Sequence, residues 1–143
     1  MYSQQIMDIF LNPKNLGKLR GANGIGQSND ELNSVIVRVY IKVEEERIIK
    51  AQAEVFGNPD LIACADFMCE LINGKPLDYA LSIKEEDLIS GLPDYIAKIC
   101  VQAIKFAVID YKDRLYKQSI KLKKSKRTLE NIENFKSILK KQL

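Results

Sequence analysis

The sequence predicts an α+β fold, in which antiparallel strands are covered by helices. β-Branched residues recur at every second position from Val35 to Val43, which is typical of a half-buried strand. After the acidic turn 44–46, a second β-rich run at 48–55 returns as the other half of a hairpin. From Pro59 onward, apolar residues recur mostly at helical spacing, so helices complete the fold.

The hairpin is followed by a well-defined helix. Asn58 is a suitable N-cap, and Pro59 fits the first helical turn because the N–H that it lacks has no partner there. The predicted helix therefore spans 59–72 and stops at Asn73-Gly74. We expect the core of the hairpin and this helix to include Ile36, Val39, Ile41, Val55, Phe56, Ile62 and Leu71.

The segments before the hairpin predict a short helix and a polar loop. Ser3 is a suitable N-cap for a helix that reaches Leu11. Pro13 ends this helix, because the residue before a proline avoids the helical conformation. Residues 27–34 read Gln-Ser-Asn-Asp-Glu-Leu-Asn-Ser, a polar composition that predicts a loop.

After the central helix, the sequence predicts a capped turn and then a long helix. Ser82 and Glu85 have the spacing of a capping box, which would begin a short helical segment. Pro93 or Asp94 then begins a long helix, whose apolar repeat continues to Val108.

The C-terminal part of the chain is strongly basic. Residues 112–143 carry 11 lysines and arginines against 3 acidic residues, a net charge of +8, so residues 1–111 carry −5. Thr128 is a suitable N-cap for a final amphipathic helix. We expect its apolar stripe to pack against the rest of the chain or against a second copy. This stripe consists of Leu129, Ile132, Leu139 and Leu143.

An alternative for the basic tail is binding to an acidic partner protein, to nucleic acid or to a membrane surface. Nucleic acid is the least favoured of these, because no aromatic residues alternate with the lysines. The candidate partner-binding residues are Lys121, Lys123, Lys124, Lys126 and Arg127.

Composition excludes several classes of function. The chain has no histidine, which excludes Ser-His-Asp and Cys-His catalytic groups, and we do not expect an enzyme. No apolar run approaches the roughly 20 residues that a membrane span needs. The first ten residues lack the basic start and apolar core of a signal peptide. We therefore expect a cytoplasmic protein without a membrane span.

Several motifs resemble the NifU/IscU family of iron–sulfur cluster assembly scaffolds. The opening Tyr2-Ser3 and the turn Asn-Pro-Lys-Asn-Leu-Gly at 12–17 carry the most specific likeness. Phe56-Gly57, Asn-Gly-Lys-Pro-Leu at 73–77 and Ala-Val-Ile-Asp-Tyr at 107–111 extend it. The resemblance implies a small three-stranded antiparallel sheet covered by helices, with the glycine-rich segment 21–26 leading in as an edge strand. It also implies two parts, a domain at 1–111 and a basic C-terminal helical extension at 112–143.

The cluster ligands of that family are three cysteines at converging loop ends. The resemblance places Asn33 and Asn58 at the first two positions, and the third position falls near Ile96 or is deleted. Amides are poor ligands for iron or zinc. We therefore expect no cofactor on the isolated chain, and an iron–sulfur cluster, iron or zinc is implied only by the resemblance.

The three cysteines of the chain offer a rearranged site little support. Cys64 and Cys69 are five residues apart on one predicted helix, so they point about 140° apart. Cys100 lies on another helix, on a face with the pattern of a buried surface. We expect these three residues to be small buried side chains.

These observations favour a divergent scaffold-like protein, an accessory or partner-binding member without the usual cluster ligands. Its partners would be a cysteine desulfurase or other assembly proteins, as the resemblance implies, or a second copy of the chain. One alternative is a functional iron–sulfur scaffold or metal carrier with unorthodox ligands. Another is a protein-interaction module unrelated to clusters, acting through the basic tail.

Overall fold

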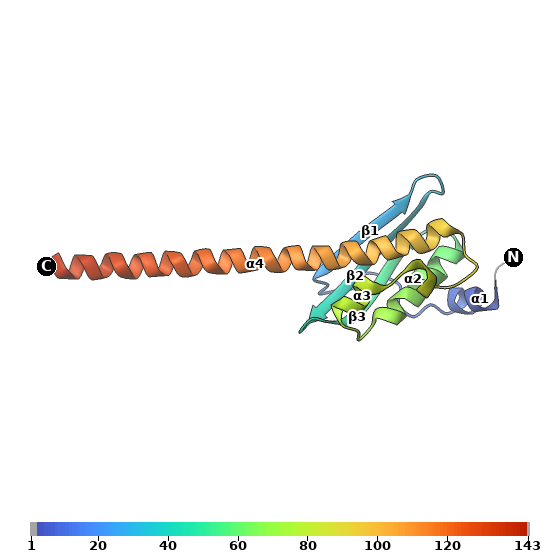
Figure 1. Cartoon of the computed structure of the whole chain (residues 1–143), viewed down its shortest axis with the longest axis horizontal. Helices are drawn as coiled ribbons and strands as arrows, with labels where there is room; N and C mark the ends of the chain where they lie inside the picture. Colours follow the sequence, from blue (N-terminus) through green and yellow to red (C-terminus); the bar gives the residue numbers. More distant parts are fainter. Residues whose placement is uncertain (1–2, 143) are drawn as a thin grey trace. The chain divides into compact units, whose positions relative to one another are not determined.

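The structure is a computed structural model that describes residues 3–142, and it confirms an α+β fold with a three-stranded antiparallel sheet (Figure 1). The chain divides into two compact units, Met1–Tyr111 and Lys112–Leu143, which are described separately below. The strands are β1 (Gly24–Asp30), β2 (Val35–Glu44) and β3 (Arg47–Phe56), paired in the order β1-β2-β3. The helices are α1 (Gln4–Leu11), α2 (Pro59–Ile72), α3 (Leu77–Ser82), the 3-10 helix η1 (Glu85–Asp87) and α4 (Asp94–Gln142).

The central hairpin forms where the alternating pattern predicts it. Glu44 pairs with Arg47, so only two residues form the turn. These residues, Glu45 and Glu46, have φ values of 52° and 62°. A two-residue turn with both φ angles positive matches the right-handed twist of the strands that it joins. The hairpin therefore forms although its turn lacks the asparagine and glycine that usually adopt this conformation.

The prediction of a loop throughout 27–34 is wrong, because residues 27–30 belong to β1. This strand pairs with β2 from Gly24 to Asp30. The pairing gives hydrogen-bond partners to backbone N–H and C=O groups that would face water in a loop. The inward-facing polar residue Ser28 donates a hydrogen bond from its hydroxyl to Oε1 of Gln102 on α4, at 2.8 Å. A polar sequence can thus form an edge strand when the helix above it supplies partners.

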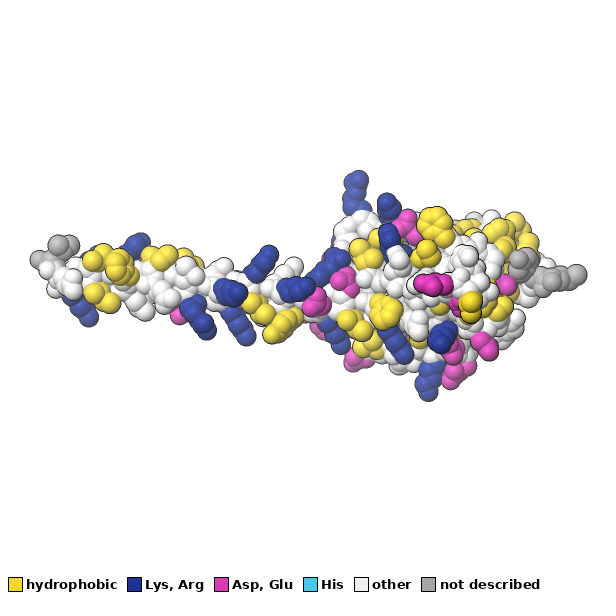
Figure 2. All heavy atoms as spheres, turned by 90° about the horizontal axis from the view of Figure 1, so that it is seen from above, with side chains coloured by type: hydrophobic (Ala, Val, Ile, Leu, Met, Phe, Trp, Pro, Cys, Tyr) yellow, Lys and Arg dark blue, Asp and Glu magenta, His cyan; other side chains and the backbone are white. Residues whose placement is uncertain are grey.

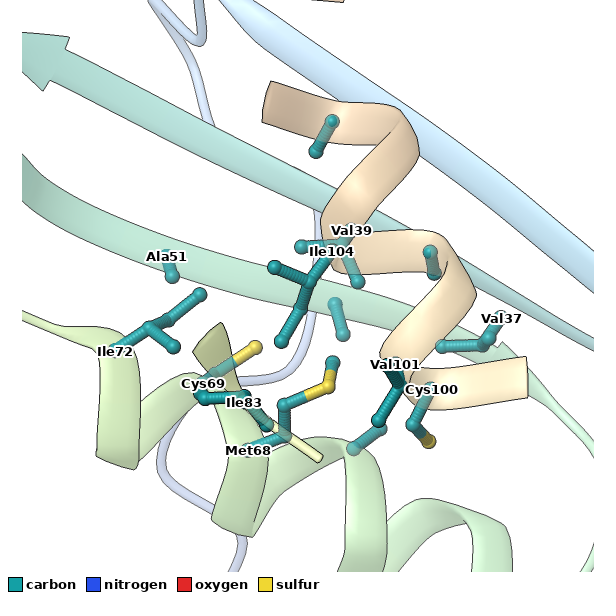
Figure 3. Packing of buried hydrophobic residues seen from close by; sticks show 14 of the residues in the cluster. Val37, Val39, Ala51, Met68, Cys69, Ile72, Ile83, Cys100, Val101 and Ile104 are labelled. Atoms are coloured by element: carbon teal, nitrogen blue, oxygen red, sulfur yellow. The ribbon is translucent and has the colours of Figure 1, made fainter. Parts of the chain in front are cut away.

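Helix α2 agrees closely with the prediction. The side chain of Asn58 caps it by accepting a hydrogen bond from the backbone N–H of Leu61 at 3.0 Å, and the helix ends before Asn73. Its inner face joins β2, β3 and α4 in one apolar core, in which Cys69 lies among Met68 and neighbouring aliphatic side chains (Figure 3).

The predicted core positions divide between the two faces of the sheet. Val39 and Ile41 are fully buried, whereas Val55, Ile62 and Leu71 are partly buried. The prediction is wrong for Ile36 and Phe56, which are 37% and 71% exposed. These two residues form a cross-strand pair on the face that the helices leave open, because neighbouring strand residues point to opposite faces.

The motif at 12–17 owes its fixed conformation to a buried carboxylate on α2. Oδ1 of Asp66 accepts hydrogen bonds from the backbone N–H groups of Lys14 and Asn15, at 2.8 and 2.6 Å. The amide of Asn15 donates to Oε2 of Glu70 at 2.9 Å. Gly17 and Asn15 also exchange backbone hydrogen bonds with Ala53 on β3. The turn therefore ties the chain after α1 to both α2 and the sheet.

The predicted capping box at Ser82 is wrong. Ser82 is the last residue of α3, and its hydroxyl donates to the carbonyl of Tyr79 at 2.7 Å. The backbone N–H of Lys84 instead donates to Oδ2 of Asp87 at 2.9 Å, which begins η1. The box moves because α3 extends through Ser82, whose backbone therefore cannot serve as the start of a new helix.

The predicted helix start at Thr128 is also wrong, because α4 continues through this position. The hydroxyl of Thr128 donates to the carbonyl of Lys124 at 3.0 Å, as it does in a helix interior. The sequence has no glycine or proline after Pro93, so no residue favours a break. Of the predicted apolar stripe, Leu143 lies outside the described residues.

The core assignment predicts different costs for two truncations in the same hairpin. Ile41→Ala should lower the free energy of unfolding by about 2–5 kcal/mol, because it removes fully buried methyl groups. Phe56→Ala should change it by about 0.5 kcal/mol or less, since that ring is mostly exposed. Urea denaturation of both variants measures the difference, and equal losses would contradict the assignment of the two faces.

Candidate functional site

One end of the sheet gathers the residues that the sequence singles out as candidate ligand positions. Ile36 pairs with Phe56, so the turn between β1 and β2 and the junction between β3 and α2 lie at the same end. A Cβ atom on Gly57 would lie 3.0 Å from Cγ1 of Val35, which shows how closely these segments approach. We call this end the sheet tip, and it comprises residues 31–34, residues 56–58 and the first turn of α4.

At the sheet tip, both polar atoms of the Asn58 side chain are engaged. Its Oδ1 accepts from the N–H of Leu61 at 3.0 Å, and its Nδ2 donates to the hydroxyl of Tyr95 at 3.1 Å. The first bond caps α2, and the second joins that cap to the start of α4. The amide is therefore a structural group that holds two helix starts together.

The other two candidate positions lie in different environments. Asn33 is exposed in the turn, where its backbone N–H donates to Oδ1 of Asp30 at 3.3 Å. Ile96 is fully buried in the core. Among the described hydrogen bonds, none joins Asn33 to Asn58. The structure thus brings Tyr95, rather than Ile96, to Asn58.

Tyr95 is the residue that completes the tip, and it lies within the stretch 95–97 where the resemblance places the third ligand position. The sequence does not show which residue of this stretch faces the tip, because adjacent helix residues point about 100° apart. Which of two neighbours faces the tip depends on the rotation of α4 about its axis, and contacts distant in the sequence fix this rotation.

The three cysteines lie in the core, as the sequence predicts. Cys64 and Cys69 on α2 and Cys100 on α4 are fully buried, and Figure 3 shows Cys69 and Cys100 among the core side chains. Burial raises the pKa of the Cys69 thiol far above its ordinary value. The neighbouring Cys64 thiol, together with burial, raises the pKa of Cys100. Cys69 and Cys100 are therefore protonated thiols, whereas metals bind thiolates.

The donor groups at the sheet tip do not fit an iron–sulfur cluster. Such clusters are held mainly by cysteine thiolates. The tip supplies two neutral amides, a phenol and the carboxylates of Glu31 and Asp94, but no thiolate, and one amide is already engaged as a helix cap. Within residues 3–142, no group of three or more histidine, cysteine or acidic side chains is arranged to hold a metal ion.

The candidate partner-binding residues belong to the second unit. Lys121, Lys123, Lys124, Lys126 and Arg127 are all exposed on α4. Figure 2 shows lysine and arginine side chains distributed along this helix. Nearby, Nζ of Lys117 forms an ion pair with Oδ2 of Asp113 at 2.9 Å. In the part of the chain that the structure describes, no helix has both the length and the apolar character of a membrane span.

The burial of the thiols predicts slow reaction with a disulfide reagent. In the folded protein at pH 8, all three cysteines should react on the order of 10² times more slowly than in denaturant, because reaction requires local opening. One thiol reacting rapidly per folded chain would contradict this placement.

The free energy of unfolding should fall as the pH rises above about 8.5, because thiols of the unfolded chain ionise there while Cys69 and Cys100 stay protonated in the fold.

Comparison with known proteins agrees with the fold and with the motifs. The model of the NifU-like N terminal domain family matches residues 1–118. The iron–sulfur cluster assembly scaffold protein IscU 1 of Archaeoglobus fulgidus is 31% identical over 117 residues, which cover 78% of this chain and 76% of that protein. IscU of Escherichia coli is 31% identical over 122 residues, covering 79% of this chain and 95% of the relative.

Solved structures share the architecture of the first unit. The crystal structure of FiSufU from Fervidobacterium islandicum AW-1 aligns with a TM-score of 0.61 at 18% identity, over 75% of this chain and 96% of that chain. A NifU-like protein of Brucella abortus aligns with a TM-score of 0.53 at 16% identity, over 77% of this chain and 83% of that chain. At such identities the likeness shows a shared fold, whereas the family match and the relatives at 31% identity show descent. The chain belongs to the NifU/IscU family of NifU-like N-terminal domains.

Proposed function

We propose that this protein acts in iron–sulfur cluster assembly as an accessory, partner-binding member that does not hold a cluster at its sheet tip. Support for the pathway comes from family membership and from relatives named as assembly scaffolds. Support for the accessory role comes from Asn58. The family resemblance places a cluster ligand at this position, but the amide of Asn58 caps α2 and donates a hydrogen bond to Tyr95.

The chemistry of the cargo explains why the bonding of Asn58 supports the proposal. A cluster needs anionic sulfur or imidazole ligands that enclose its iron atoms. Turning the Asn58 amide toward a metal would remove the cap of α2, which costs about 1 kcal/mol, and would gain only a weak neutral ligand. The core thiols cannot reach a cluster in solvent without unfolding the helices that bury them.

Exposed apolar side chains offer a surface for partner binding. Leu32 in the turn between β1 and β2 is 97% exposed, and the pair Ile36 and Phe56 lies at the same end of the sheet. Charged groups flank this pair, since Arg38 forms an ion pair with Glu54 on the open face. Apolar side chains rimmed by polar ones are typical of protein interaction sites. We propose that an assembly protein such as a cysteine desulfurase binds here.

Anaerobic reconstitution of the full chain with ferrous iron and sulfide tests the accessory role. The expected result is no visible absorption from a cluster and iron well below one atom per chain after desalting, because the tip lacks thiolates. Metal and sulfide analysis with absorption spectroscopy provides the measurement. One stable cluster per chain or per dimer would overturn the proposal and favour a working scaffold with unorthodox ligands.

Restoring thiols at the tip should create a metal site. The triple variant Asn33→Cys, Asn58→Cys and Tyr95→Cys should bind zinc with an affinity at least about tenfold above the parent chain, because three thiolates then face one end of the sheet. The matched control replaces Ile96 instead of Tyr95, and should gain less because that side chain lies in the core. Competition with a chromogenic zinc chelator measures both affinities. Equal gains in the two variants would contradict the geometry of the tip.

A further inference from the structure

The helix of the second unit has a heptad pattern that the proposed function leaves unexplained. Leu115, Leu122 and Leu129 are spaced seven residues apart. Ile132 and Leu139 are also seven residues apart, and each lies three heptad positions after the position of the leucines. These side chains are between 45% and 63% exposed. Apolar residues at the first and fourth positions of successive heptads form the seam of a coiled coil. In this register the polar residues at first and fourth positions are Gln118, Ser125 and Lys136. We call the five apolar residues the heptad seam.

The period of the heptad seam favours a helical partner over a flat membrane surface. On a straight α-helix, a seven-residue repeat drifts by about 20° per heptad. A bilayer contacts one face of a straight helix, so it would meet the seam over only part of its length. A second helix that winds around the first with a left-handed supercoil stays in contact with the drifting seam throughout.

The residues beside the heptad seam indicate an acidic partner. In a coiled coil, the positions that flank the seam form the interhelical ion pairs and set the choice of partner. From 112 to 142, only Glu133 is acidic at these positions. The basic residues at flanking positions are Lys112, Arg114, Lys121, Lys126 and Lys140.

The same charges disfavour a second copy of the chain as the partner. In a parallel pair of identical helices, Lys121 of one chain would oppose Lys126 of the other. Lys136, seven residues after Leu129, occupies the first position of its heptad and would face its own counterpart. With 11 basic and 3 acidic residues in 112–143, each copy would also carry a net charge of +8 into the pair. An acidic helix turns these repulsions into attractions.

We propose that residues 112–142 form a left-handed coiled coil with an acidic amphipathic helix of another protein. Leucine or isoleucine heptads of the partner would pack on the heptad seam, and its glutamates or aspartates would pair with Lys121 and Lys126. The interaction uses neither the sheet tip nor a cluster, so it stands independently of the proposed function.

Two synthetic peptides of four heptads test this proposal with the full chain. Both carry leucine at the seam positions; one carries glutamate at all flanking positions and the other lysine. In fluorescence anisotropy titrations, the glutamate peptide should bind in a one-to-one complex, at least about tenfold more tightly than the lysine peptide. Failure to bind the glutamate peptide, or equal binding of both, would overturn the proposal.

Matched variants locate the contact on the helix. Replacing Leu122 and Leu129 with asparagine should weaken binding of the glutamate peptide by at least about tenfold. Ile138→Asn, which changes a similarly exposed residue outside the heptad seam, should leave binding within about twofold. The melting temperature should stay unchanged in all of them. If only the Leu122 and Leu129 variant had a lowered melting temperature, the heptad seam would be buried by other residues of the same protein, and the proposal would be overturned.

Charge reversals distinguish register-specific pairing from general attraction to polyanions. Lys121→Glu with Lys126→Glu should weaken binding of the glutamate peptide several-fold more than Lys123→Glu with Lys124→Glu, which changes net charge equally at outward positions. Equal losses would overturn the proposal. So would tighter binding to anionic vesicles or duplex DNA than to the peptide. Self-association of the unmixed chain that the Leu122 and Leu129 changes abolish would identify a second copy as the partner and overturn it as well.

Discussion

The close approach of α4 to β1 is the constraint on which the arrangement of the first unit depends. A Cβ atom on Gly26 would lie 2.2 Å from the carbonyl oxygen of Ala103, so only glycine allows the two backbones to come this near. At the flanks of this contact, the N–H of Ile25 donates to Oδ2 of Asp110 and Ser28 donates to Gln102, both at 2.8 Å. These contacts fix both the direction of α4 along β1 and its rotation.

This fixed rotation determines what the sheet tip contains. Tyr95 lies about 12 Å along the helix before Ala103, at 1.5 Å per residue, and its hydroxyl meets the amide of Asn58. Ile96, its neighbour, turns into the core. The glycine contact on the edge strand β1 therefore determines which side chain completes the tip, although the two places are far apart in the sequence.

Local physical rules predicted much of the fold, and long-range packing accounts for what they missed. The cap and length of α2 follow from Asn58 and the periodicity after it, and the hairpin follows from alternation in β2 and β3. The exposure of Phe56 follows from the alternation in β3, since Phe56 lies on the same face as Lys50, Gln52 and Glu54. Its hydrophobic side chain outweighed this pattern in the prediction. At the candidate site, the residue types at 33 and 58 were readable from the sequence. The engagement of Asn58 with Tyr95 required the position of α4.

The doubly bonded amide of Asn58 also constrains how this sequence can change. A single substitution to cysteine would remove the cap of α2 and the link to Tyr95 together, while leaving one isolated thiol that holds no cluster. On a stepwise mutational path toward three thiolates, the change at Asn58 therefore loses stability unless the other two thiolates are already present to gain ligand affinity. The tip is held in its present chemical state by epistasis, since the benefit of each cysteine depends on the other two being present.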